Sequence, residues 1–414
     1  MSVERNITTQ TITGTVEKVI YGGFGLIRHN SLVVFVRGVL PHEEVSVRIT
    51  NVKSRYAEGT LLSILKPSPD RVSPRCPHYG SCGGCQLQHA APSCHALLKK
   101  GFLEEALYHL PHPPIDVVPS NHVWAWRRKI TLHVKGGKLG LIGNDNTSLI
   151  PITACPIFFR PEEENTIIAL TIVARTLADQ SDICCFRLPN DALAIMVKSP
   201  RQIPRTLLKQ LTAVPSMEAF SIHCPSWNYS EGLHDFSFEA LGSRWYFSID
   251  AFVQNHLSQS EQVWKTVIDR VGSGKLKILD LYSGIGVTAI SLARQGHSVT
   301  AVEYSKKAVL AAKKSASNTP LTLLWSKVET AIPKLCCDYD WWIVNPPRSG
   351  LSEQALRFLL DKRPQNVLYV SCSPATLARD CRALVQAKWN IVWGKAFDLF
   401  PQTTHFETVL QLAL

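Results

Sequence analysis

The segment 250–414 alternates short apolar runs with amphipathic stretches, and this alternation constrains the fold more than any other feature. Expected strands cover Lys277–Leu281, Ser298–Val302, Leu321–Trp325, Trp341–Val344 and Asn366–Val370, and expected helices cover Val287–Gln295, Ser305–Ser317 and Pro374–Lys388. Strands that alternate with helices predict a parallel sheet with crossover helices, an α/β fold. Asn390–Phe397 and Glu407–Leu412 follow with no helix between them. These two segments predict a terminal antiparallel hairpin on a mostly parallel sheet.

Composition narrows the class of protein. The chain has 414 residues, of which 45% are hydrophobic and 19% charged, which predicts a globular protein of two or three domains. The formal net charge of +11 favours an anionic partner such as nucleic acid. There is no run of eighteen apolar residues and no apolar signal core in Met1–Gln10, so we expect a cytoplasmic protein. In that reducing compartment, most of the twelve cysteines are expected to be buried and unpaired.

The N-terminal segment, Thr11–Ile64, has the pattern of several short strands. Val45, Val47 and Ile49 alternate with polar residues, as in a half-buried strand. Short strands separated by turns predict a small Greek-key β-barrel of the oligonucleotide-binding kind for residues 1–66. Such a barrel either binds RNA or only packs against its neighbour.

Pro67, Pro69 and Pro74 indicate a linker, after which residues 67–249 have a mixed α/β pattern. Within this central region, Trp124–Lys129 combines two tryptophans with three basic residues. Such a segment can stack on bases and neutralise phosphates. A strand that buries its tryptophans and exposes its arginines has the same spacing. The third domain is predicted to cover residues 250–414.

A glycine-containing turn, Asp280–Gly286, joins the first strand of this last domain to a helix. Gly284 and Gly286 allow a ligand to approach the backbone at the helix N-terminus. Glu303 follows at the end of the next strand, where an acidic residue usually binds ribose hydroxyls. Ala289 replaces the third glycine of a dinucleotide fingerprint. The pattern therefore favours a nucleoside ligand without a pyrophosphate, although a tight turn in another α/β domain would look similar.

Three further motifs are expected at the same edge of the sheet. Asn345–Arg348 and Ser371–Pro374 each follow a strand, and Glu407 opens the last one. A thiol and a carboxylate would thus lie beside a nucleoside pocket. Addition of a thiolate to C6 of uracil makes C5 nucleophilic, and a base must then remove the C5 proton. Cys372 is the candidate nucleophile and Glu407 the candidate base, whereas Cys372 taken alone would be read as a buried structural cysteine.

A second group of cysteines suggests a metal centre. Cys76, Cys82 and Cys85 lie within ten residues, and two glycines between the last two permit a sharp turn. Thiolates at this spacing suit either zinc or an iron–sulfur cluster. The fourth ligand must come from elsewhere; the candidates are Cys155, which is favoured, Cys94, and for zinc His78 or His89.

Taken together, these motifs resemble the family of RNA uracil-C5 methyltransferases. The resemblance is carried by Asp280–Ala293, Asn345–Leu351, Tyr369–Asp380, Phe397–Thr408 and Phe252–Asn255. It implies a Rossmann-like methyltransferase domain that binds S-adenosylmethionine, with Cys372 as nucleophile and Glu407 as base. The cofactor contacts that it implies, with the glycines of the turn, are Gln254, Tyr282, Gly284, Gly286, Glu303 and Asn345. The family usually has Asp where this chain has Asn345, an amide that can accept a hydrogen bond but carries no charge.

The segment Cys76–His89 resembles the cluster loop of the same family. The resemblance implies a structural [4Fe-4S] cluster held by Cys76, Cys82, Cys85 and Cys155, and a barrel of the TRAM type. Members of the family that act on tRNA generally lack both features, so this chain resembles the 23S rRNA enzymes. The expected partner is therefore 23S rRNA, with no obligate protein partner. Two alternatives remain open: the same chemistry on tRNA, and a non-catalytic RNA-binding or ribosome-assembly protein that retains the fold.

Overall fold

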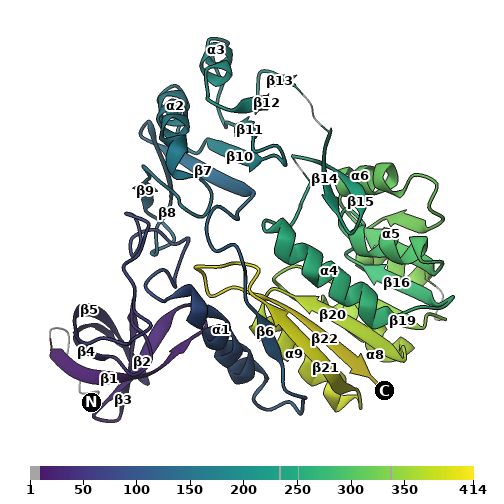
Figure 1. Ribbon diagram of the computed structural model, residues 1–414, viewed down its shortest axis with the longest axis horizontal. Helices are drawn as coiled ribbons and strands as arrows, with labels where there is room; N and C mark the ends of the chain where they lie inside the picture. Colours follow the sequence, from purple (N-terminus) through teal and green to yellow (C-terminus); the bar gives the residue numbers. More distant parts are fainter. Residues whose placement is uncertain (1–9, 233–234, 250, 336–337) are drawn as a thin grey trace.

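The computed structural model describes residues 10–232, 235–249, 251–335 and 338–414. Asp250, where the sequence places a domain boundary, and Met1–Thr9 lie outside the described residues. Figure 1 shows a small barrel, a central sheet and a larger sheet arranged around a common middle region. Within the described part of the chain, every helix is too short or too polar to cross a bilayer.

The N-terminal strands close into a barrel, as predicted. Its strand order is β1-β2-β3-β5-β4, and the strands are β1 (Thr11–Ile20), β2 (Phe24–His29), β3 (Leu32–Arg37), β4 (Glu44–Val52) and β5 (Tyr56–Lys66). Val45, Val47 and Ile49 are at most 1% exposed and fill the barrel interior. The alternating pattern of β4 is therefore confirmed.

The segment after the barrel is tied to it by polar contacts. Arg71 forms an ion pair with the fully buried carboxylate of Glu43 and donates a hydrogen bond of 2.8 Å to the Gly38 carbonyl. His89 hydrogen-bonds the Val39 carbonyl at 3.0 Å through Nε2. Burial lowers the pKa of His89 to about 4, so the imidazole is neutral and Nε2 is the donor. The barrel is thus fixed against the loop that carries Cys76–His89.

The central region contains a seven-stranded sheet of order β13-β12-β11-β10-β7-β8-β9 and a separate hairpin, β14–β15. One face packs against α2 and α3, and the other packs its Phe186 and Met196 against the hairpin. The elements are β7 (Lys129–Lys135), β8 (Lys138–Ile142), β9 (Leu149–Pro151), η1 (Pro161–Glu163), α2 (Glu164–Ala174), β10 (Asp182–Arg187), β11 (Leu193–Lys198), α3 (Leu207–Thr212), β12 (Met217–His223), β13 (Asn228–Glu231), β14 (Asp235–Ala240) and β15 (Ser243–Ser248).

The C-terminal sheet has eight strands in the order β18-β17-β16-β19-β20-β22-β21-β6. Its elements are α4 (Leu257–Val271), β16 (Lys277–Leu281), α5 (Val287–Arg294), β17 (Ser298–Glu303), α6 (Lys306–Ala316), β18 (Thr322–Trp325), α7 (Val328–Ala331), η2 (Ile332–Lys334), β19 (Trp341–Val344), α8 (Glu353–Lys362), β20 (Asn366–Ser371), α9 (Pro374–Gln386), β21 (Asn390–Phe397) and β22 (Glu407–Ala413). Strands β16 to β20 pair in parallel, and β22 is antiparallel to both β20 and β21. The predicted mostly parallel sheet with a terminal antiparallel hairpin is confirmed.

Two elements that precede the central sheet in sequence, a strand and a helix, are part of this C-terminal domain. Strand β6 (Asp116–Val118) pairs in parallel with β21 and forms the sheet edge. Helix α1 (Pro92–Leu107) covers the same face as α7, α8 and α9, whereas α4 and α5 cover the other face. In Figure 1, β6 and α1 therefore lie beside the C-terminal strands β21 and β22. This arrangement brings residues before the central sheet close to the end of the chain.

Candidate active site

The turn after β16 is fastened to the tip of β17 by Glu303. One carboxylate oxygen of Glu303 accepts the Gly284 amide at 2.9 Å, and the other accepts the Ser305 amide at 2.8 Å. Gly284 and Gly286 have φ angles of 58° and 80°, in the left-handed region that favours glycine. The predicted glycine turn and its acidic partner are thus in direct contact, and Glu303 retains lone pairs for a ligand hydroxyl.

Two other side chains of this turn, those of Asp280 and Tyr282, have raised pKa values. Burial and the neighbouring Glu303 raise the pKa of Asp280 to about 8, so this carboxyl group is mostly protonated at neutral pH. Tyr282 has φ of 63°, which is unusual for a residue other than glycine and is typical of functional turns. Burial raises the Tyr282 pKa to about 12, and the phenol hydrogen-bonds Ser352.

The remaining two predicted cofactor contacts lie on different loops. Asn345 follows β19, and its backbone N–H donates to the Leu281 carbonyl at 3.2 Å. This hydrogen bond places Asn345 beside the end of β16. Gln254 lines a pocket with Arg128, Phe186 and Phe247 between the central sheet and the β14–β15 hairpin. The structure therefore places Asn345 against the start of the glycine turn, whereas Gln254 lines a pocket whose lining includes no residue of that turn.

The strand pairing places Cys372 and Glu407 opposite each other. Ser371, the last residue of β20, pairs with Thr408 of β22. Because these strands are antiparallel, the next pair along this register is Cys372 and Glu407. Glu407 is 2% exposed, and the Cys372 side chain is partly exposed. The thiol and the carboxyl group that the sequence singled out are therefore brought together at the carboxyl edge of the parallel strands.

The guanidinium group of Arg348, for which the sequence predicts no role, interacts electrostatically with both side chains. Burial and Glu407 together raise the Cys372 pKa to about 11, and the positive charge of Arg348 opposes this rise by favouring the thiolate form. Burial also raises the pKa of Glu407 to about 8, and Arg348 opposes this rise. The sequence signal for Arg348 was its place at the end of the Asn345–Arg348 motif. Its cationic side chain can stabilise both anions that the chemistry requires.

Residues Asp398–Phe406, which we call the catalytic loop, connect β21 to Glu407. Helix α1 supports this loop through Lys99, which is fully buried. The Lys99 ammonium donates to the Asp398 carboxylate at 2.5 Å and to the Phe400 carbonyl at 3.0 Å. Burial lowers the Lys99 pKa, but Asp398 counteracts that shift. Moving the loop away from α1 would leave one of these charges buried without its partner, which strongly destabilises a folded protein. The ion pair therefore holds the loop in place.

Two other regions also contact the catalytic loop. The amides of Gln86 and Leu87, in the cysteine-rich loop, both donate to the Gln402 carbonyl, at 3.1 and 3.0 Å. Trp126 stacks on His256 and meets the ring of Phe400 edge-on at 6.1 Å. Trp126 is only 7% exposed. Of the two readings of this segment, the buried one therefore holds for Trp126, whose ring packs against other side chains of the protein.

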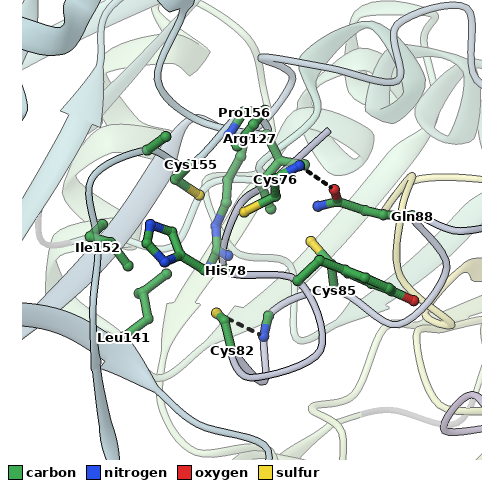
Figure 2. A pocket seen from close by; sticks show the side chains of 14 residues that line it. Cys76, His78, Cys82, Cys85, Gln88, Arg127, Leu141, Ile152, Cys155 and Pro156 are labelled. Atoms are coloured by element: carbon green, nitrogen blue, oxygen red, sulfur yellow. Dashed lines mark hydrogen bonds between the residues drawn. The ribbon is translucent and has the colours of Figure 1, made fainter. Parts of the chain in front are cut away.

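The four predicted metal-ligating cysteines line one cavity between the cysteine-rich loop and the central sheet. Figure 2 shows Cys76, Cys82, Cys85 and Cys155 around this space. Gly83 leaves little room for a side chain at the turn, because a Cβ atom there would lie 3.0 Å from the Gly143 carbonyl oxygen. Its amide donates to the Ile142 carbonyl at 3.0 Å, which anchors the loop to β8.

The structure separates two of the alternative ligands, Cys94 and His89, from this cavity. Cys94 lies in α1, where its thiol donates to the Ala91 carbonyl at 3.0 Å. His89 is occupied by Tyr79 and Val39. His78 lines the cavity, but its Nε2 accepts the Thr153 amide at 2.9 Å. Among the described residues, no three His, Cys, Asp or Glu side chains are grouped as ligands of a single metal ion, and the described cysteines are all free of disulfides.

Comparison with known proteins decides the family. The family described as tRNA (Uracil-5-)-methyltransferase matches residues 336–413, the TRAM domain matches residues 8–62, and the methyltransferase small domain matches residues 250–360. An uncharacterized RNA methyltransferase of Protochlamydia amoebophila is 33% identical over 97% of both chains. The chain belongs to the RNA (uracil-5-)-methyltransferase family.

Other uracil-C5 methyltransferases are similar to this chain over nearly its full length. A 23S rRNA (uracil(1939)-C(5))-methyltransferase of Klebsiella pneumoniae is 28% identical and covers 99% of this chain and 97% of its own. The crystal structure of Pyrococcus abyssi tRNA (uracil-54, C5)-methyltransferase in complex with S-adenosyl-L-homocysteine superposes with a TM-score of 0.79 over 97% of this chain, at 22% identity. The fold of this RNA (uracil-5-)-methyltransferase, from barrel to Rossmann-like sheet, is therefore confirmed.

Proposed function

We propose that this protein transfers a methyl group from S-adenosylmethionine to C5 of a uridine in 23S rRNA, through a covalent bond between Cys372 and C6. The observation that carries the proposal is the position of Cys372, directly after β20, beside Glu407 at the start of β22, with the charge of Arg348 acting on both. A thiol and a buried carboxyl group at this edge of the sheet supply the two functions that methylation of C5 requires.

Cys372 would add to C6 of the uracil as its thiolate, which Arg348 stabilises. The electron pair displaced from the C5–C6 double bond makes C5 nucleophilic. After methylation, C5 carries both the methyl group and a proton. Glu407 would take this proton in its ionised form, the C5–C6 double bond would re-form, and the thiolate would leave. The raised pKa of Glu407, about 8, suits a base that must bind a proton near neutral pH.

The turn and loops beside this pair are suited to a nucleoside cofactor. S-adenosylmethionine supplies an electrophilic methyl group when bound. We assign its ribose to Glu303, its other contacts to Tyr282, Gln254 and Asn345, and its close approach to the backbone at Gly284 and Gly286. Support comes from the left-handed turn that Glu303 fastens and from the position of Asn345 beside the end of β16.

The barrel offers a surface for the RNA. Arg37 lies 3.9 Å above the ring of Phe24, which contacts Phe35, and Phe35 contacts Tyr56. These side chains are at least partly exposed on β2, β3 and the start of β5. Aromatic rings and a guanidinium plane can stack on unpaired bases. They support an RNA-binding role for the barrel, and the full-length similarity to 23S rRNA enzymes supports that substrate.

We further propose that Cys76, Cys82, Cys85 and Cys155 hold a structural [4Fe-4S] cluster. The donor set fits, since four thiols line one cavity, and a cluster needs its ligands farther apart than a single ion does. Because its loop also hydrogen-bonds the catalytic loop, the cluster would stabilise the site without taking part in the reaction.

We also propose three domains, residues 1–66, 67–249 and 250–414, with β6 and α1 packed onto the sheet of the last one. The proposed location is the cytoplasm, where the ribosomal substrate is found.

Labelled-methyl transfer tests the function. The protein, purified anaerobically, is incubated with labelled S-adenosylmethionine and total RNA from a strain that lacks its gene. Label in 23S rRNA as 5-methyluridine, absent with Cys372→Ala, is the expected result. Label in tRNA alone would assign the same chemistry to another substrate. RNA binding without methyl transfer would indicate a non-catalytic protein, and Asn345 would then be the first position to examine.

A further inference from the structure

The turn between β1 and β2, residues Tyr21–Gly23, connects the barrel directly to the catalytic loop. The Tyr21 hydroxyl lies 2.7 Å from Nδ1 of His405, a hydrogen bond between residues 384 positions apart. On the other side of the turn, a Cβ atom on Gly23 would lie 2.7 Å from Cβ of Gln86, and φ of Gly23 is 81°. The turn is therefore wedged between the cysteine-rich loop and the catalytic loop.

Besides its hydrogen bond to His405, Tyr21 packs against a cluster of aromatic rings. Its ring meets the rings of Phe102, His405 and Phe406 edge-on, with centroids 6.3, 5.7 and 6.4 Å away. Burial raises the pKa of Tyr21, Arg348 lowers it and Cys372 raises it again. The phenol therefore lies within electrostatic range of the guanidinium and thiol groups of the catalytic pair.

His405 is neutral at working pH, because burial lowers its pKa to about 4. A neutral imidazole has one donor and one acceptor nitrogen, and the Tyr21 hydroxyl can pair with Nδ1 in either tautomer, so this hydrogen bond holds the ring in place. The next two residues are Phe406, which is 1% exposed, and Glu407. Holding His405 therefore also holds the start of β22, where the carboxyl group must face Cys372.

We propose that Tyr21 of the barrel is a positioning residue of the methyltransferase site, which acts through His405. The barrel then has a second role besides RNA binding: it completes the site from a separate domain. The proposal rests on the proposed function, because it needs a methylation rate to measure. It predicts that the barrel tyrosine affects the chemical step and leaves substrate affinity unchanged.

Tyr21→Phe is the direct test, since it removes the hydroxyl and keeps the ring. The single-turnover rate at which methylated RNA is released from its adduct with Cys372, at saturating RNA and cofactor, should fall about two- to tenfold, the factor that corresponds to one ordinary hydrogen bond. The KM for RNA and the KM for S-adenosylmethionine should not change. Tyr108→Phe is the matched control, because Tyr108 is 79% exposed and lies beside His109 on the far end of α1; its rate should equal that of the wild type.

A double-mutant cycle tests the route through His405. His405→Ala should lower the rate, and adding Tyr21→Phe to it should have no further effect. Additive losses, a normal rate for Tyr21→Phe, or a rise in KM alone would each overturn the positioning role. A wild-type protein that transfers no methyl group would instead refute the proposed function, so the two failures are distinguishable. Unchanged thermal unfolding of Tyr21→Phe confirms that the variant is folded.

Discussion

Replacing Glu407 with Gln should trap the protein on its RNA. The variant keeps the size of the side chain and a hydrogen-bonding group but cannot accept the C5 proton. Addition of Cys372 to C6 and methylation of C5 precede proton removal, so both still occur. Elimination of the thiolate requires the base and should therefore stop. The expected product is a methylated covalent adduct between protein and RNA.

The expected rate of product release follows from the pKa of Glu407. Its pKa of about 8 means that about one molecule in ten carries the ionised base at pH 7 and about half do at pH 8. Release of product by the wild type should therefore accelerate about fivefold between these pH values, and should be lost as the pH falls further. A positioned general base typically contributes about 10²- to 10⁴-fold, so release from Glu407→Gln should be slower by that factor and should show no such rise.

The assay is a denaturing gel with label on either the RNA or the methyl group. Both labels should migrate with Glu407→Gln and neither with Cys372→Ala. Wild-type protein with 5-fluorouridine RNA is a positive control, because fluorine cannot leave as a proton does. Normal turnover by Glu407→Gln would refute the reasoning and make His405 the next candidate base. Methyl transfer by Cys372→Ala would refute the covalent mechanism as a whole.

Three more outcomes are expected. Cys155→Ala should lose iron and sulfide while Cys94→Ala keeps both, and stoichiometric zinc in the wild type would contradict the cluster. Asn345→Asp, which restores the usual family residue, should raise kcat/KM for the cofactor several-fold; a loss would show that the amide is needed here. Arg37→Ala should weaken binding of unpaired RNA about fivefold or more, as expected for a lost stacking contact, without changing the pH dependence of turnover; unchanged RNA affinity would contradict the barrel surface.

Elements whose pattern is set locally could be predicted from the sequence. The strands of the C-terminal sheet are buried on both faces and thus form continuous apolar runs, and β16, β19 and β21 match their predicted limits. Helices α4, α7 and α8 were not predicted, although Ser352, the residue before α8, caps that helix with its hydroxyl. Strand β6 has only three residues, too few to show a period, and its pairing with β21 depends on tertiary packing.

The candidate site shows the same division. Cys372 and Glu407 could be predicted because each terminates or begins a recognisable strand beside a motif. Tyr21 and Arg348 could not, because their roles depend on contacts across the chain: Tyr21 meets a histidine 384 positions away, and Arg348 matters only because two strands bring a thiol and a carboxyl group to it. The two readings of Trp126 could not be separated from the sequence either, because its partner His256 lies in a distant part of the chain.

The position of β22 between β20 and β21 has a consequence for synthesis of the protein. This last strand supplies the pairing partner for both neighbours, so each presents an open edge until the final residues, Glu407–Ala413, have left the ribosome. Unpaired strand edges are templates for association with other chains. A chain that terminates before residue 407 should therefore be prone to aggregation as well as inactive, and nascent chains are exposed to this hazard for as long as their last strand is still being made.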